Sequence, residues 1–119
     1  MKDQGLYLDQ IKEFIARIDR YTASGKEVLL NDEMVQDAVI RNFISIGEAV
    51  KRLDDAVKAK APEVDWRGAA GFRDILAHWY DKVELDEVWE VIIQDLPILK
   101  AVVERLLTDY PEDNPLDEP

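Results

Sequence analysis

The chain has 119 residues, of which 15 are basic and 26 acidic, giving a formal net charge of −11, and it contains no cysteine. This length suits one domain. The acidic balance argues against general nucleic-acid binding, which usually requires a surplus of lysine and arginine, and the lack of cysteine excludes disulfides, thiolate catalysis and thiolate zinc sites. Nucleic acid would therefore have to bind at a small basic focus, or the acidic surface would meet a basic protein partner.

The two ends of the chain carry distinct signals. The start, Met1-Lys2-Asp3-Gln4, lacks the apolar core and cleavage site of a signal peptide, and no apolar run reaches the length of a membrane span. Residues 109–119 are acidic and contain no lysine or arginine. We therefore expect a cytoplasmic protein without a membrane anchor, with a domain over residues 1–108 and an acidic flexible tail over residues 109–119.

Helical periodicity dominates the first half of the chain, and no segment shows the alternating pattern of a β-strand. Between residues 4 and 22, apolar side chains recur every three or four positions, which predicts an amphipathic helix. A longer pattern begins after Asn31 or Asp32, either of which can cap a helix, and continues to about Ala59. Pro62 then prevents the second helix from continuing.

The second half predicts two more helices. One begins near Asp65, whose carboxylate can accept the unpaired amides of the first turn, and continues to about Tyr80. Another begins at Asp86, carries apolar residues on one side as far as Leu106, and should be kinked by Pro97. Short connections between four helices predict an all-α, antiparallel, up-and-down four-helix bundle with room for an extra short helix.

The predicted second helix carries a line of polar residues through an apolar zone. Between residues 39 and 50, apolar side chains leave hardly any solvated face, as in a helix buried nearly all round. The polar line consists of Arg41, Ser45, Glu48 and Arg52. One interpretation is an exposed Glu48–Arg52 ion pair of small energetic value. The other is a polar strip that faces a cleft or a second subunit, where desolvated charges need partners.

Residues 71–80, Gly-Phe-Arg-Asp-Ile-Leu-Ala-His-Trp-Tyr, contain the only histidine, His78, five positions after Arg73. Imidazole is the one side chain whose unperturbed pKa lies near neutrality, so His78 is the candidate proton carrier if the protein is an enzyme. The Arg73 guanidinium can hold two phosphate oxygens. On a regular helix Tyr80 would nearly eclipse Arg73, with His78 about 140° away. The alternative is a structural histidine packed beside Trp79 and Tyr80.

Several blocks of the sequence, taken in order, resemble one family. They are Arg41–Ala49, Pro62–Trp66, Gly71–Tyr80, Val88–Trp89 and Leu96–Leu99. Together they resemble the HEPN superfamily, specifically the HepT-like toxins that are encoded beside a minimal nucleotidyltransferase antitoxin. The similarity covers roughly residues 8–107, and its most specific element is Arg-x4-His-x-Tyr, here Arg73, His78 and Tyr80. The residue that follows the arginine in this superfamily is commonly polar and often asparagine. Asp74 departs from this pattern because it is polar but acidic.

This resemblance implies a metal-independent endoribonuclease that needs no bound cofactor and is built as a homodimer or higher oligomer, with Arg73 and His78 of both subunits facing one cleft. The ribose 2′-hydroxyl would attack the adjacent phosphate, with His78 as general acid or base and Arg73 stabilising the charged transition state. Two symmetry-related histidines would divide the acid and base roles. The candidates for supporting residues in the cleft or dimer interface are Arg41, Asn42, Glu48 and Asp74.

The same resemblance implies that a cognate nucleotidyltransferase antitoxin, as in type VII-like toxin–antitoxin systems, transfers AMP to Tyr80. A phosphate beside Arg73 and His78 would exclude RNA by size and charge. The alternative for Tyr80 is a helix-end aromatic packed on the core. Two other functions stay open, namely a non-catalytic substrate- or nucleotide-binding subunit of a two-component nucleotidyltransferase, which suits the acidity, and a plain oligomerising interaction protein.

Overall fold

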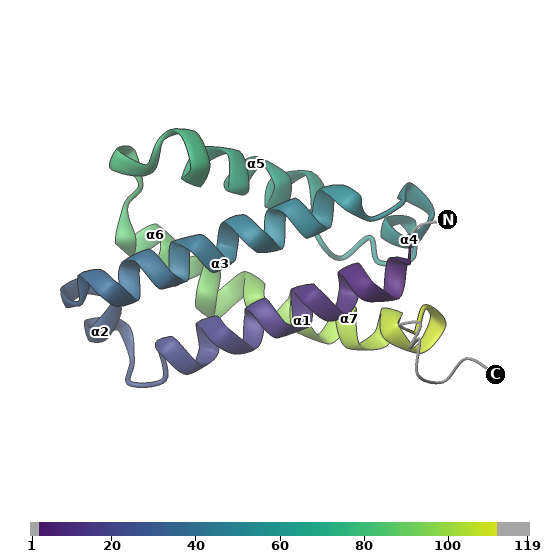
Figure 1. Ribbon diagram of the computed structural model, residues 1–119, viewed down its shortest axis with the longest axis horizontal. Helices are drawn as coiled ribbons and strands as arrows, with labels where there is room; N and C mark the ends of the chain where they lie inside the picture. The colour runs from purple at the N-terminus through teal and green to yellow at the C-terminus, as the bar shows by residue number, and fades with distance from the viewer. Residues whose placement is uncertain (1–2, 112–119) are drawn as a thin grey trace.

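The computed structural model describes residues 3–111, and these form an all-α bundle. Its long helices are α1 (Gln4–Tyr21), α3 (Glu33–Arg52), α5 (Trp66–His78) and α7 (Leu96–Asp109). Successive long helices run in alternating directions, and α3 lies between α1 and α5 (Figure 1). Helix α1 also packs against α7. The predicted up-and-down bundle is confirmed.

Most of the buried apolar side chains of the core come from α1, α3 and α7. The apolar stripe predicted for the first helix is fully buried there, with side chains that are at most 1% exposed, at Leu8, Ile11, Ile15 and Ile18. Helix α1 covers the predicted range almost residue for residue. A helix with one apolar face becomes stable by burying that face against its neighbours, which is why the periodicity alone located α1.

An extra short helix, α2 (Lys26–Asn31), fills the connection between α1 and α3. It begins after Gly25, whose φ of 107° is the kind of backbone conformation that glycine adopts readily, and it buries Leu29. Asp32 then caps α3 as predicted, since its carboxylate accepts the backbone N–H of Met34 at 2.9 Å.

The predicted length of the second helix is wrong. Helix α3 ends at Arg52, and a separate short helix, α4 (Asp55–Ala59), follows. Between them the backbone of Leu53 is extended and its side chain enters the core. The backbone N–H of the next residue, Asp54, donates to Oε1 of Gln4 in α1 at 2.7 Å. A contact 50 residues away therefore satisfies an amide that a continuous helix would have paired internally.

Helix α5 begins as predicted, because the Asp65 carboxylate accepts the backbone N–H of Gly68 at 2.8 Å. It ends at His78, two residues before the predicted end. Tyr80 instead opens a short 3₁₀ turn, η1 (Tyr80–Lys82). The expected eclipsing of Arg73 by Tyr80 on one regular helix therefore does not apply.

The fourth predicted helix is divided, and it starts slightly earlier than expected. Helix α6 (Leu85–Glu90) is preceded by Glu84 in the capping position, without a side-chain capping bond. Asp86, the predicted cap, lies in the first turn and pairs with Lys26 of α2 at 2.8 Å. An acidic side chain in the first turn still interacts favourably with the helix dipole.

A π-helical stretch, η2 (Val91–Asp95), joins α6 to α7 just before Pro97. Proline has no N–H to donate to the carbonyl four residues earlier, and its ring crowds that carbonyl. The wider π turn is a known way of accommodating such an interruption. The predicted disturbance at Pro97 is thus a local change of helix type.

Helix α7 ends at Asp109. Residues 112–119 of the predicted acidic tail lie outside the described residues. No helix within residues 3–111 combines the length and apolar character needed to cross a membrane.

Candidate active site

Helices α3 and α5 are in close contact where Gly47 faces Arg73. A Cβ atom added to Gly47 would overlap the Cβ of Arg73 and lie 2.6 Å from its Cγ. Only glycine therefore allows the two helix backbones this approach. The Arg73 side chain, which is 23% exposed, consequently lies directly against α3.

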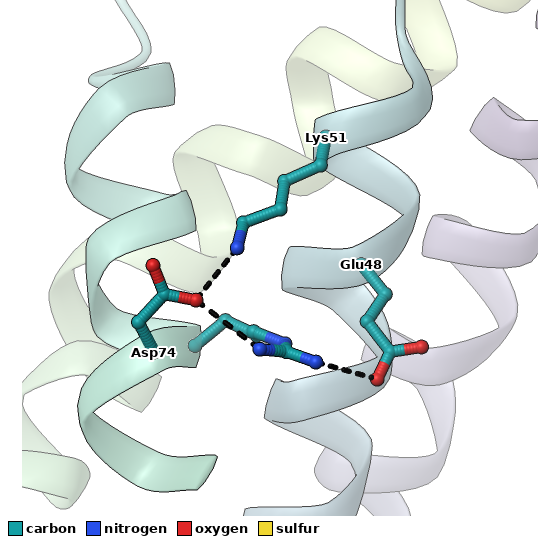
Figure 2. Close-up of polar contacts among 4 residues, drawn as sticks. Glu48, Lys51 and Asp74 are labelled. Carbon is teal, nitrogen blue, oxygen red and sulfur yellow. Dashed lines mark hydrogen bonds and ion pairs between the residues drawn. The ribbon is translucent and has the colours of Figure 1, made fainter. Parts of the chain in front are cut away.

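Four charged side chains from the two helices form a cluster, which we call the Arg73 cluster. The two outer nitrogens of Arg73 contact Oε1 of Glu48 at 3.3 Å and Oδ1 of Asp74 at 3.2 Å. Nζ of Lys51 donates to the same Asp74 oxygen at 2.6 Å (Figure 2). With two cations and two carboxylates, the Arg73 cluster has no formal net charge.

The contacts in the Arg73 cluster stabilise the charged form of each affected group. The hydrogen bond from Lys51, and then the one from Arg73, lower the pKa of the Asp74 carboxyl. Glu48 and Asp74 raise the pKa of Arg73, which stays protonated. Among the described residues, the buried Nε of Arg73 has no hydrogen-bond partner. Each outer nitrogen carries two hydrogens and gives one to a carboxylate, so a phosphate binds the remaining hydrogens beside both carboxylates or displaces one of them.

His78 is the last residue of α5, five positions after Arg73, and it is exposed. Within residues 3–111 its side chain makes no hydrogen bond or ion pair, and none connects it to Arg73. Three neighbouring apolar or aromatic side chains are also about half exposed, namely Ile75 (51%), Trp79 (55%) and Tyr80 (49%). The end of α5 is thus an uncovered, partly aromatic surface around the histidine.

Tyr80 borders a groove along α3. Its hydroxyl donates to Oδ1 of Asp37 at 2.7 Å, and this bond is the main cause that raises the tyrosine pKa. The groove has a volume of about 400 Å³. Its lining consists of Asp37, Ile40, Arg41, Ile44, Ser45, Glu48 and Tyr80. The tyrosine is therefore tied to α3 through its hydroxyl rather than packed into the core.

Three of the four residues of the polar line on α3 face this groove. Arg41, Ser45 and Glu48 all line it. The predicted Glu48–Arg52 ion pair is wrong, because Glu48 pairs with Arg73 and the Arg52 guanidinium lies 5.9 Å from the centre of the Tyr7 ring. The interpretation of the line as a strip facing a cleft fits the structure.

Of the other predicted supporting residues, two lie at the site and one does not. Asp74 lies in the Arg73 cluster, and Arg41 lies in the groove. Asn42 is buried and donates to the backbone carbonyl of Ala38 at 2.8 Å, and it does not line the groove. The described part of the chain holds no group of three or more acidic or histidine side chains arranged for a metal ion.

Two residues of the site were missed in the sequence. Asp37 lies four positions before Arg41, so it extends the polar line by one helical turn. Lys51 lies three positions after Glu48 and faces the same neighbouring helix. Helical spacing was the signal that could have identified both, because residues three and four apart share a face.

The bundle and its Arg-x4-His-x-Tyr motif are those of a HEPN-type domain. The model of the family described as "Ribonuclease HepT-like" matches residues 11–106. The chain is 39% identical to "Probable ribonuclease HepT" of Thermococcus cleftensis over 84% of its own length and 92% of that protein. The chain therefore belongs to the HepT-like ribonuclease family.

Two further relatives carry ribonuclease names. A "Putative RNase" of Caldanaerobacter subterraneus is 34% identical over 90% of this chain and 96% of that protein. A "Gamma-glutamylcyclotransferase and putative RNase" of Methanocaldococcus jannaschii is 37% identical over 91% of this chain, which spans about half (49%) of that longer protein. No solved structure matches the chain.

Proposed function

We propose that this protein is a metal-independent endoribonuclease, active as a homodimer, and the cytoplasmic toxin of a toxin–antitoxin pair. Membership of the HepT-like ribonuclease family supports RNA as the substrate. The observation that carries the proposal is the layout of α5, which fixes Arg73 against α3 and presents an unpaired His78 at an exposed end. A cation for phosphate and a free imidazole for proton transfer are the two groups that this chemistry needs.

The uncovered end of α5 supports a dimer. Ile75 and Trp79 expose about half of their surface beside His78, and such clustered apolar side chains commonly mark interaction sites. A two-fold related copy covering this end would bring a second histidine to the same place, because a two-fold interface uses the same patch on both subunits. One site would then contain both the general base and the general acid.

The reaction follows from these groups. The His78 of one subunit accepts the proton of the ribose 2′-hydroxyl, whose oxygen attacks the adjacent phosphorus. The bond to the 5′-oxygen breaks, and the His78 of the other subunit donates a proton to that oxygen. The products are a 2′,3′-cyclic phosphate and a 5′-hydroxyl end. Arg73 stabilises the charge that develops on the phosphate oxygens.

Tyr80 is the proposed site of neutralisation by a cognate nucleotidyltransferase antitoxin. Its hydroxyl reaches the surface beside the groove and is already hydrogen-bonded to a carboxylate, Asp37, that can accept its proton. Transfer of AMP from ATP to this oxygen would release pyrophosphate. The bulky, charged nucleotide would then stand near the residues that receive RNA phosphate.

The test is cleavage of end-labelled RNA by the purified wild type and by Arg73→Ala, His78→Ala and Arg105→Ala. Arg105 is the matched control, because it also pairs with a carboxylate, Glu63, at 2.6 Å. Cleavage should be lost in the first two variants and kept in the third. Cleavage that persists in His78→Ala would contradict the catalytic assignment. Mass spectrometry after co-expression with a candidate cognate nucleotidyltransferase should show an added AMP in wild type but none in Tyr80→Phe.

A second candidate function is a non-catalytic binding subunit of a nucleotidyltransferase. The observation that favours it is the charge balance of the Arg73 cluster, in which two carboxylates already occupy the arginine. This function predicts no RNA cleavage and, instead, binding of a nucleotide that Asp37→Ala or Arg41→Ala weakens. The cleavage assay therefore separates the two candidates.

A further inference from the structure

Asp74 shares one oxygen between two cations from different helices. Its Oδ1 accepts from Lys51 of α3 at 2.6 Å and from Arg73 of α5 at 3.2 Å (Figure 2). The lysine contact is the shorter, and it also makes the largest contribution to the lowered pKa of Asp74. Lys51 is therefore the main partner of this carboxylate.

An acidic residue at position 74 works against phosphate binding by its neighbour. The carboxylate occupies one outer nitrogen of Arg73, and its charge repels an incoming phosphate. Glu48 occupies the other outer nitrogen and, within residues 3–111, has Arg73 as its only cationic partner. Asp74 differs because it has a second cation to which it can stay bound.

We propose that Lys51 is a positioning residue that holds Asp74 away from Arg73 when RNA phosphate binds. Lys51 keeps the Asp74 carboxylate after the phosphate has taken its place on Arg73, and it offsets the carboxylate charge beside that phosphate. Glu48 meanwhile keeps the guanidinium oriented. The proposal rests on the proposed ribonuclease function, and it explains how an acidic residue can follow the arginine of the motif.

The position of Lys51 suits this role. It lies one helical turn after Gly47, on the face of α3 that packs against Arg73 of α5. The side chains of Lys51 and Asp74 are 43% and 49% exposed, so a phosphate can reach them without a rearrangement of the core. The lysine can therefore keep its contact with Oδ1 of Asp74 while the contact of the same oxygen with Arg73 is released.

The experiment compares Lys51→Gln, Asp74→Asn and the double variant with wild type. Lys26→Gln is the matched control, since Lys26 pairs with Asp86 at 2.8 Å and its loss changes the net charge equally. Cleavage kinetics are measured on a labelled mixed-sequence RNA. Affinity is measured by fluorescence anisotropy with its 2′-O-methyl analogue, which lacks the attacking hydroxyl.

Lys51→Gln should raise KM and the analogue Kd about tenfold, with kcat within about twofold, because Asp74 then has only Arg73 as a cationic partner. Asp74→Asn should bind as well as wild type or better. The KM and Kd of the double variant should return to within about twofold of those of Asp74→Asn. The KM and Kd of Lys26→Gln should stay within about twofold of the wild-type values.

Three outcomes would overturn the inference. Equal weakening by Lys51→Gln and Lys26→Gln would show a general charge effect, and a double variant as weak as Lys51→Gln would show direct RNA binding by the lysine. Unchanged Kd and KM in Lys51→Gln would show that Lys51 has no role in phosphate binding. If wild type does not cleave but the Kd pattern holds, the ribonuclease function fails while the role of Lys51 in phosphate binding stands.

Discussion

The middle of α5, at Arg73, and its C-terminal end, at His78, differ in what holds their functional side chains. Arg73 is fixed against α3 by the Gly47 contact and by two carboxylates. His78 is exposed and has no partner within the described chain, and Tyr80 just beyond it is tied by a single hydrogen bond to Asp37. The folding of one chain therefore orients the cation but not the imidazole, and we infer that a second subunit or the RNA itself orients the histidine.

The strongest test of this difference is His78→Ala. We expect RNA cleavage to fall by about 10²–10⁴-fold, the usual effect of losing a general acid or base. Thermal unfolding should stay unchanged, since the exposed His78 side chain has no hydrogen bond or ion pair within the described chain. Cleavage rates and melting curves provide the measurements. A large drop in melting temperature would show that His78 is held by the fold after all.

The next test addresses the packing at Arg73 by comparing two glycine substitutions. Gly47→Ala should destabilise the protein by about 1–3 kcal/mol, because the new methyl group overlaps Arg73. Gly71→Ala, on α5 with open space at its Cβ position, should stabilise it by about 0.5–1 kcal/mol through helix propensity. Denaturant unfolding measures both. Stabilisation by both variants would mean that the two helices are not in close contact at Gly47.

A smaller effect on stability is expected from the hydrogen bond between Tyr80 and Asp37. Removal of the hydroxyl in Tyr80→Phe should cost about 0.5–1 kcal/mol, because the bond to Asp37 is partly exposed. A double-mutant cycle with Asp37→Asn, read by denaturant unfolding, isolates the coupling. Additive effects of the two substitutions would show that the hydrogen bond contributes nothing to stability.

The smallest effect is the acid dependence of the Arg73 cluster. The pKa of Asp74 is lower in the folded protein than in the unfolded chain, mainly because of Lys51. Its stabilising contribution is therefore present above the unfolded value of about 3.9 and is lost as the pH falls through the folded value. The stability difference between wild type and Asp74→Asn should shrink over this range in unfolding experiments. A difference that persists below the folded pKa would contradict the ion-pair assignment.

Apolar spacing and capping residues predicted the helices well where no contact with a distant part of the chain intervened. The apolar spacing located α1, and the carboxylates of Asp32 and Asp65 cap α3 and α5 as expected. The end of α3 was predicted wrongly because it depends on the buried Leu53 and on Gln4 of another helix. Propensity and periodicity carry no information on a partner 50 residues away.

The helical class, the capping residues and the motif of Arg73, His78 and Tyr80 follow from the sequence, because they depend on neighbours within a few helical turns. The partners of the charged groups do not follow from it, because they come from distant parts of the chain. Glu48 meets Arg73 across 25 residues, Lys51 meets Asp74 across 23, and Tyr80 meets Asp37 across 43. Each of these pairs depends on how α5 and the turn after it lie against α3, and that arrangement is set by packing at Gly47 and in the core.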